Sequence, residues 1–131
     1  MTSLDLDKLR DHCLTLGYSA ERSARERLDV TLTTSVILVF SNLVDASDSL
    51  IGFKGTPWHI HGKTTLMTSE AEYVELNEYE LLSGLKAGEV VVIERFVSGV
   101  LQDRWVADRR ARVDMSYIQP HEELRVRSVA D

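Results

Sequence analysis

The chain has 131 residues, of which 44% are hydrophobic and 27% are charged. This composition is typical of an ordinary globular protein, and it excludes disordered, collagen-like and coiled-coil chains. The length suits one core, so we expect residues 1–131 to form a single domain. Fifteen Lys and Arg stand against 21 Asp and Glu, for a net charge of −6. Proteins that bind phosphate backbones are usually basic, so no direct nucleic-acid ligand is expected.

The cysteine content and the hydropathy pattern predict the compartment. The only cysteine, Cys13, cannot form an internal disulfide, which fits a reducing environment. The N-terminus lacks the basic stretch and apolar run of a signal peptide. The longest apolar run, residues 36–40, is much shorter than the roughly 20 residues that span a bilayer. We therefore expect a cytoplasmic protein with no membrane partner.

Helical patterns occupy the first part of the chain. Apolar residues follow helical spacing from residue 6 to residue 16, Ser3 can cap the start of this helix, and Gly17 can end it. Residues 19–28 carry only two alanines and one leucine as an apolar line. This thin line predicts a second, short helix.

A change of period after residue 28 predicts strands. Residues 30–41 alternate with period two and are rich in β-branched side chains, which is typical of one long strand. Residues 50–53 and 59–68 predict further strands, with a bend near Pro57, because proline cannot donate to a ladder.

A third helix and a hairpin are predicted farther along the chain. Asn77 and Glu80 have the spacing of a capping box, and Gly88 falls near the end of that helix. Residues 89–97 are apolar on both faces and predict a central strand. Ser98 and Gly99 then predict a two-residue turn into the next strand. The last two predicted strands are residues 112–118 and 123–129.

The predicted hairpin raises a question of charge. With a regular two-residue turn, Glu94 lies opposite Asp103, and like charges directly across a hairpin are unfavourable. Either a cation or a basic group of a partner neutralises them, or arginines of the same sheet, such as Arg125 and Arg127, do so. In sum, we expect an α+β fold with two N-terminal helices, followed by a largely antiparallel sheet of about six or seven strands with one short inserted helix.

The negative charge is concentrated in one block. Residues 70–94 hold seven glutamates against Lys86 alone, an imbalance equal to the net charge of the whole chain. Such a block is either a solvated face or a docking surface for a basic partner. On the second interpretation, the candidate partner-binding residues are Glu70, Glu72, Glu75, Glu78, Glu80 and Trp58.

A pair of histidines carries the alternative hypothesis. His59 and His61 point to the same side of an extended strand, where they could share a metal ion. With Ser69 and Glu72 they resemble the His-x-His-x7-Ser-x-x-Asp signature of JAMM metalloproteases. The resemblance implies a small zinc-dependent hydrolase in which His59, His61 and Glu72 hold the metal. The chain departs from the signature at Glu72, which replaces Asp, and at Gly62, which replaces the usual Pro.

The whole chain also resembles, in type rather than in motif, the immunity proteins that bacteria pair with contact-delivered or polymorphic toxins. The likeness lies in small size, acidity, α+β character and the absence of a complete active site. Many of those toxins are basic nucleases. The resemblance implies a binding protein with no cofactor, whose carboxylates pair with Lys or Arg in the active-site cleft of a toxin. We expect this function rather than an enzymatic one, with the zinc hydrolase as the alternative.

Overall fold

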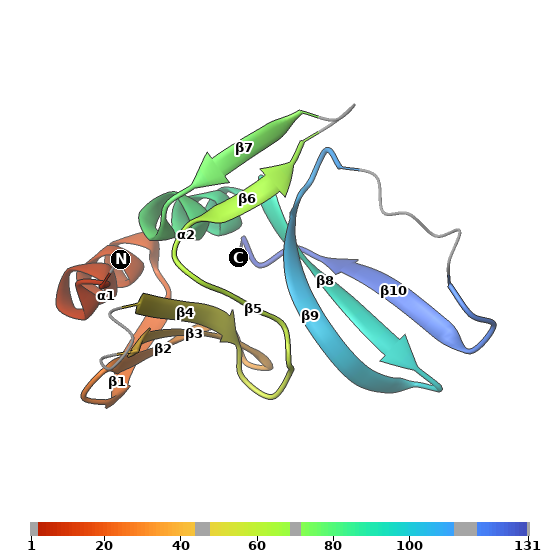
Figure 1. Ribbon diagram of the computed structural model, residues 1–131, viewed down its shortest axis with the longest axis horizontal. Coiled ribbons are helices and arrows are strands. Elements are labelled where there is room, and N and C mark those ends of the chain that lie inside the picture. The colour runs from red at the N-terminus through yellow and green to blue at the C-terminus, as the bar shows by residue number, and fades with distance from the viewer. Residues whose placement is uncertain (1–2, 44–47, 69–71, 112–117, 131) are drawn as a thin grey trace.

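The computed structural model describes residues 3–43, 48–68, 72–111 and 118–130. Within these ranges it contains two helices and ten strands (Figure 1). In chain order they are α1 (Leu6–Leu16), β1 (Ser19–Ala24), β2 (Arg27–Thr33), β3 (Val36–Leu43), β4 (Asp48–Phe53), β5 (His59–Ile60), β6 (Thr64–Met67), β7 (Tyr73–Leu76), α2 (Glu78–Ala87), β8 (Val90–Val97), β9 (Val100–Asp108) and β10 (Glu122–Arg127). None of the helices in these ranges is long and apolar enough to cross a membrane.

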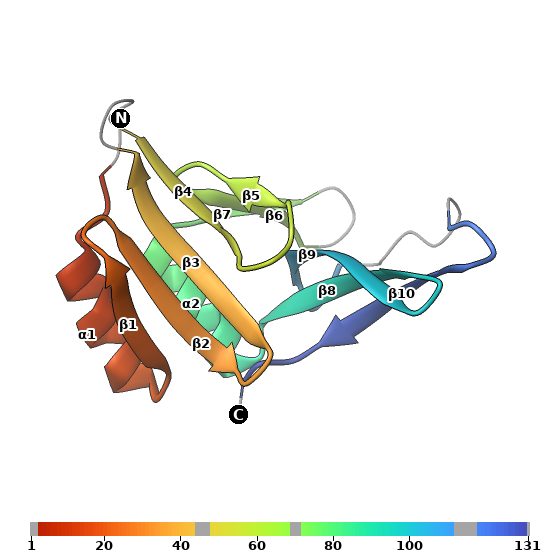
Figure 2. The ribbon, with the colours of Figure 1, turned by 90° about the horizontal axis from the view of Figure 1, so that it is seen from below.

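The strands form three antiparallel sheets. Strands β1 to β5 follow one another in a five-stranded sheet, β6 pairs with β7, and β8 lies between β10 and β9. Both helices lie on the same face of the five-stranded sheet (Figure 2). The core fills the space between them, and Leu9, Phe40 and Leu81 are fully buried there. Burial of such side chains is the main source of stability, at roughly 1.5 to 3 kcal/mol each.

The predicted fold is wrong in the number and the order of its elements, because the described residues are mostly sheet, with ten strands instead of six or seven and only one helix at the N-terminal end. Residues 19–28 form β1 and the start of β2 rather than a second N-terminal helix, and the strands form three sheets rather than one. The turn between β1 and β2 is made by Arg25 and Glu26, without the Gly, Pro, Asn or Asp that usually marks a turn. Charged residues at this position made the segment look like a polar helix.

The long strand predicted for residues 30–41 is two strands. β2 and β3 pair through a turn at Thr34 and Ser35, which contains none of the stronger turn residues Gly, Pro, Asn and Asp. Register partners in a hairpin share a face, so Val30 and Leu38 both point into the core. Buried and exposed positions therefore keep the same alternation before and after the turn. For this reason the hydrophobic pattern of the sequence does not reveal the turn.

The segments after Pro57 also differ from the prediction. Residues 59–68 divide into β5 and β6, which belong to different sheets. Strand β7 was not predicted. The strand predicted at 112–118 falls almost wholly outside the described residues, and the one predicted at 123–129 corresponds to β10.

Several local predictions are confirmed. Gly17 ends α1 with a φ of +93°, a value that favours glycine. The start of α1 is capped by Asp5 instead of Ser3, and the Asp5 side chain accepts from the amide of Lys8. The capping box of α2 is complete, since Asn77 accepts from the Glu80 amide and the Glu80 side chain accepts from the Asn77 amide.

The turn at Ser98 and Gly99 is present, but the predicted register beyond it is wrong. Both residues have positive φ, 50° and 79°, as the tightest hairpin turns require. A bulge next to Arg95 then shifts the pairing, so that Glu94 faces Arg104 and Arg95 faces Asp103. Opposite charges therefore meet across this hairpin, and Glu94 does not lie opposite Asp103.

The last described residues are part of the core. Val129 is 1% exposed, and its carbonyl oxygen accepts a hydrogen bond of 2.6 Å from the hydroxyl of Tyr18. The ring of Tyr18 is itself buried beneath the side chain of Lys86. A contact between residues 18 and 129 therefore joins the two ends of the described chain.

Candidate functional site

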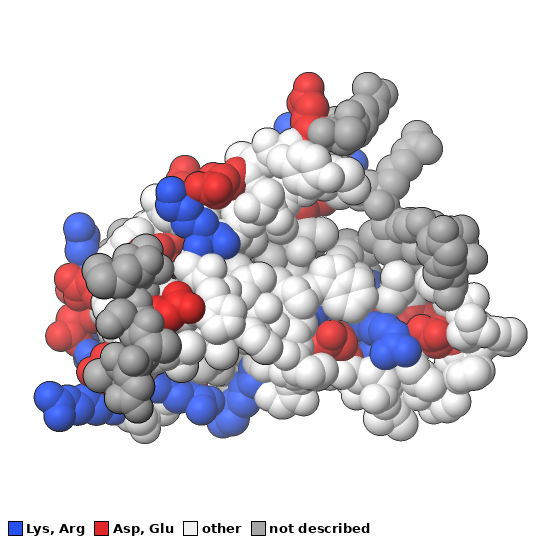
Figure 3. Space-filling model, viewed as in Figure 1, with Lys and Arg blue, Asp and Glu red and all other residues white. Residues whose placement is uncertain are grey.

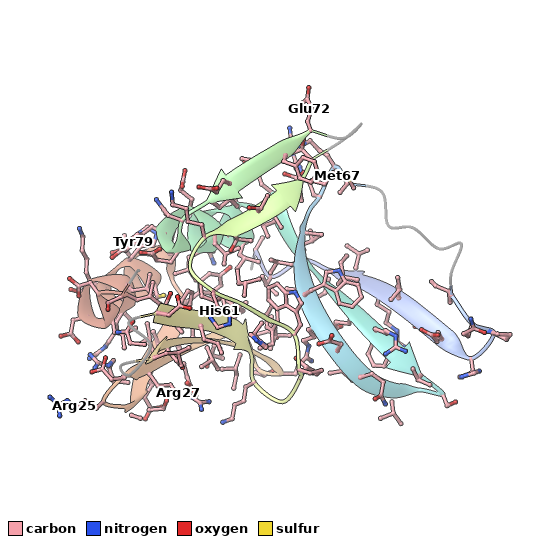
Figure 4. The ribbon with its side chains drawn as sticks, in the orientation of Figure 1. Arg25, Arg27, His61, Met67, Glu72 and Tyr79 are labelled. Carbon is pink, nitrogen blue, oxygen red and sulfur yellow. The ribbon has the colours of Figure 1, made fainter. Side chains whose placement is uncertain are left out.

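The β6–β7 hairpin extends from the body of the molecule (Figure 1). Its two faces differ because side chains alternate along a strand. Val74 and Leu76 pack against the hydrophobic core, whereas Tyr73 points outward. Met67 is the register partner of Tyr73, and the two are 44% and 68% exposed. The outward face of the hairpin thus presents two adjacent large apolar side chains, with Met67 labelled in Figure 4.

Carboxylates flank this apolar pair. Glu75 lies on the same outward face, where Oε1 is 3.0 Å from Nζ of Lys63. The hydrogen bond and the charge of Glu75 raise the pKa of Lys63. Glu72 lies at the start of β7 and is exposed at the far end of the hairpin (Figure 4). In Figure 3, carboxylate groups lie along the upper edge of the molecule, with Lys and Arg groups beside them.

The two glutamates at the start of α2 have a structural role. Glu80 is exposed, and its Oε1 accepts from the Asn77 amide at 3.0 Å within the capping box. Glu78 is partly buried in the same first turn. Carboxylates in the first turn stabilise a helix through its dipole. These two side chains therefore order α2 in addition to adding negative charge.

A groove of about 400 Å³ runs between β7, α2 and the adjoining ends of β8 and β9. Val74 and Leu76 form its apolar wall, and Glu80 and Glu89 add negative charge to its lining. Asp108 and Arg110 also line it, and they form a two-point ion pair of 2.9 and 3.0 Å. The hydrogen bond from Arg110 is the main cause of the lowered pKa of Asp108, although burial opposes it.

One member of the predicted acidic block is unavailable to any partner. Glu94 is 1% exposed, and its carboxylate binds Arg104 at 2.8 Å and Arg127 at 3.0 Å. Arg127 is one of the arginines expected to neutralise this hairpin. The position of Glu94 directly after an unbroken apolar run is the sequence signal for this burial.

The other predicted partner-binding residues do not all lie together. Glu72 and Glu75 share the β6–β7 hairpin, whereas Glu70 lies outside the described residues. Trp58 precedes β5, which belongs to the five-stranded sheet and not to the β6–β7 hairpin. Its ring packs on Phe53 with the centroids 5.8 Å apart. Trp58 therefore belongs to a different surface from the acidic hairpin.

The histidines are neighbours, but the third predicted metal ligand is elsewhere. The rings of His59 and His61 are 5.4 Å apart and nearly perpendicular. Nδ1 of His61 is 3.0 Å from the Asp48 carboxylate, and Nδ1 of His59 is 3.0 Å from the Pro57 carbonyl oxygen. Figure 4 shows Glu72 far from His61. No group of three or more His, Cys, Asp and Glu in the described ranges could hold a metal ion.

The exposed pair on the hairpin was missed by sequence reasoning. Residues 73–76 alternate between outward and inward side chains, but four residues are too few to separate a strand from a loop. Met67 ends an apolar pair and resembles a core residue in the sequence. Comparison of the chain with models of known protein families, with curated proteins and with solved structures gives no match in any of the three.

Proposed function

We propose that this chain is an inhibitor that binds a basic protein partner through the outward face of its β6–β7 hairpin. The exposed Met67 and Tyr73 pair, flanked by Glu72 and Glu75, is the observation that supports the proposal. Methionine and aromatic side chains are enriched in protein interfaces, and a few such anchors usually carry most of the binding energy. Carboxylates beside them attract and orient a basic partner.

The conformation of the β6–β7 hairpin is fixed by a hydrogen bond between its strands and by packing against the core. The Thr68 amide donates to the Glu72 carbonyl oxygen at 2.8 Å, which ties the ends of the two strands together. Val74 and Leu76 anchor the inward face to the core. A surface that is ordered before binding loses less conformational entropy when the complex forms.

The partner class follows from the chemistry of the surface. A nuclease holds phosphates with Lys and Arg in its cleft, and an inserted acidic hairpin would pair with those cations and exclude the substrate. We therefore assign the chain, as a proposal, to the cytoplasmic immunity proteins that neutralise a bacterial toxin. This function needs no cofactor, because carboxylates and apolar side chains supply the contacts.

The test is binding to the protein encoded by the open reading frame next to this gene, measured by calorimetry. We expect a complex that weakens when the salt concentration rises from about 0.1 to about 0.5 M. Tyr73→Ala should weaken it by roughly 30-fold, which corresponds to a hot spot of about 2 kcal/mol. The double variant Glu72→Lys with Glu75→Lys should weaken it further and slow association.

Matched controls come from β10, on another part of the surface. Val126 is 61% exposed and Glu123 is exposed, so Val126→Ala and Glu123→Lys make the same kinds of change away from the hairpin. Both should leave the affinity unchanged. The absence of a complex, or an affinity that ignores the hairpin variants and salt, contradicts the proposal.

A further inference from the structure

Strand β7 has one edge that pairs with no other strand in the described ranges. Its partner in the two-stranded sheet is β6, and Figure 1 shows β7 at the upper edge of the molecule with β6 below it. The free edge of a strand presents a row of amide and carbonyl groups. A strand of another chain can pair with such a row, which is a recurring way for proteins to bind extended segments.

The hydrogen bonds of the hairpin show which groups lie on this free edge. The Thr68 amide donates to the Glu72 carbonyl oxygen at 2.8 Å, so the carbonyl of Glu72 points toward β6. Because this direction alternates along an antiparallel strand, the amides and carbonyls of Tyr73 and Glu75 point away from β6. Outside the strand ladders, no backbone hydrogen bond between described residues uses these groups. The edge therefore offers two donors and two acceptors to an added strand.

The groove of about 400 Å³ lies beside this edge. Val74 and Leu76 line it together with residues of α2, whereas no residue of β6 contributes to its lining. The groove is therefore on the side of β7 that faces away from β6. Side chains alternate along a strand, so every second side chain of an added strand would lie beside Val74 and Leu76, over the groove.

The lining of the groove favours basic side chains. Glu80, Glu89 and Asp108 are acidic, whereas Arg110 is the only basic residue among those that line it. The hydrogen bond with Asp108 and, to a smaller extent, the charge of Glu89 raise the pKa of Arg110. With three acidic residues against one basic residue, the lining keeps an excess of negative charge. A Lys or Arg side chain could place its stem on the apolar wall and its charge near these carboxylates.

The outer strands β1 and β10 carry features that discourage pairing, and β7 does not. Four of the six residues of β10 are charged, and the register of β1 is irregular between Glu21 and Ala24. Charges and bulges protect edge strands from pairing with other chains. Strand β7 has a regular register with β6, and Glu75 is its one charged residue. Its edge is therefore the best suited of the three for an added strand.

We propose that β7 receives an extended basic segment of the partner as an added strand. The backbone groups of Tyr73 and Glu75 hydrogen-bond to this segment, and Lys or Arg residues at alternate positions of the segment lie over the groove. This inference rests on the proposed inhibitor function, because it specifies how the basic partner binds at the β6–β7 hairpin.

The first test is amide hydrogen exchange, followed by NMR in the full chain labelled with ¹⁵N. The chain is measured alone and with the protein encoded by the neighbouring open reading frame. In the free chain, we expect rapid exchange at Tyr73 and Glu75 and slower exchange at Val74 and Leu76, which pair with β6. The complex should slow exchange at Tyr73 and Glu75 by at least about tenfold.

Two outcomes of this experiment separate the two proposals. Rapid exchange at Tyr73 and Glu75 in a complex that Tyr73→Ala weakens would overturn strand addition and leave the proposed function intact. The absence of any complex would overturn both.

The second test removes one backbone donor. Glu75→Pro and Glu75→Gln both remove the carboxylate, but only proline also removes the amide N–H. The proline variant should bind about tenfold more weakly than the glutamine variant, since one backbone hydrogen bond is lost. Equal affinities of the two variants would overturn the proposal. If circular dichroism shows that the proline variant is unfolded, the exchange measurement decides.

The matched control for this variant lies on β10. The His121 carbonyl oxygen accepts from the Ser98 amide, so by the same alternation the amide of Val126 points away from β8. Val126 is 61% exposed, and Val126→Pro should leave the affinity unchanged. A loss equal to that of Glu75→Pro would mean that proline acts through the fold instead of through the edge of β7, and would contradict the proposal.

A third test concerns the charge of the groove. Glu89→Gln should weaken the complex about threefold, because a basic side chain of the segment loses a nearby carboxylate. Glu21→Gln removes an exposed carboxylate from β1 and should have no effect. Equal affinities of these two variants would show that the groove does not receive basic side chains.

Discussion

Glu94 and Arg104 are register partners on β8 and β9, and Arg104 Nε donates to Glu94 Oε2 at 2.8 Å. Both side chains are buried, and Arg127 of β10 binds the other carboxylate oxygen at 3.0 Å. Arg127 also donates to the hydroxyl of Ser35 in the turn between β2 and β3. The ion pairs of the buried Glu94 are therefore linked to the five-stranded sheet by an exposed hydrogen bond from Arg127.

Removal of Glu94 should be strongly destabilising, because two buried or half-buried guanidinium groups would lose their counter-charge. We expect Glu94→Ala to lower the free energy of unfolding by about 3 to 5 kcal/mol, measured by urea denaturation. Glu123→Ala removes an exposed carboxylate from the same sheet and should change stability by no more than about 0.5 kcal/mol.

A double-mutant cycle tests the shifted register directly. Alanine substitutions at Glu94 and Arg104 should show a favourable coupling between the two residues. The cycle for Glu94 and Asp103 should give a coupling near zero, since the bulge places these two side chains on opposite faces of the sheet. Strong repulsion between Glu94 and Asp103 would mean that the bulge is absent.

Cys13 should be chemically inert in the folded protein. It is fully buried, and burial raises the pKa of its thiol to about 11. At about pH 8 only about 0.1% of such a thiol is ionised, and the thiolate is the reactive form. We expect little reaction with Ellman's reagent in the native state and one equivalent after denaturation in urea. Rapid reaction of the native protein would contradict the packing of α1.

Asp108 should contribute a pH-dependent part of the stability. Because Arg110 lowers the pKa of Asp108 in the folded state, the ionised carboxylate favours folding. This contribution is complete above the unfolded pKa near 4 and is lost as the pH falls through the folded value. Asp108→Asn should therefore cost more stability at about pH 7 than at about pH 2.5 in urea titrations.

The control for this prediction removes the partner. In an Arg110→Gln background, the main cause of the lowered pKa of Asp108 is absent. In this background, the loss of unfolding free energy caused by Asp108→Asn should differ less between the two pH values than it does in the wild-type chain. The same variation in both backgrounds would show that Arg110 is not the cause.

The turn between β8 and β9 can be improved. Ser98 has a φ of 50°, a conformation that asparagine adopts more readily than serine, and Asn followed by Gly is the preferred sequence for this turn. We expect Ser98→Asn to raise the melting temperature slightly and Gly99→Ala to lower it. A lower melting temperature for Ser98→Asn would contradict the turn geometry.

Local signals in the sequence predicted some elements well. Asn77 and Glu80 located α2, and Ser98 with Gly99 located the turn, because these residues form their structures through contacts within a few positions. The turns at residues 25–26 and 34–35 carry no comparable signal. They form because the neighbouring strands pair and bury Leu28 and Val36, which is a tertiary effect.

The candidate site was harder to predict than the helices. A sum of the charges over residues 70–94 counts exposed and buried glutamates equally. Glu75, however, is on the surface, whereas Glu94 is inside the protein. Whether each glutamate is exposed or buried depends on the face of β7 or β8 on which its side chain lies. The bulge beside Arg95 sets the register of the second strand, and nothing local in the sequence marks that bulge.

The hydrogen bond between Tyr18 and Val129 bears on the order in which the chain can fold during synthesis. Its two ends are separated by 111 positions, so the ring of Tyr18 acquires this partner only after nearly all the described residues have been made. Until then α1 and β1 can form, but the core beneath them stays open. The part of the core that Val129 covers is therefore completed only after residue 129 has left the ribosome.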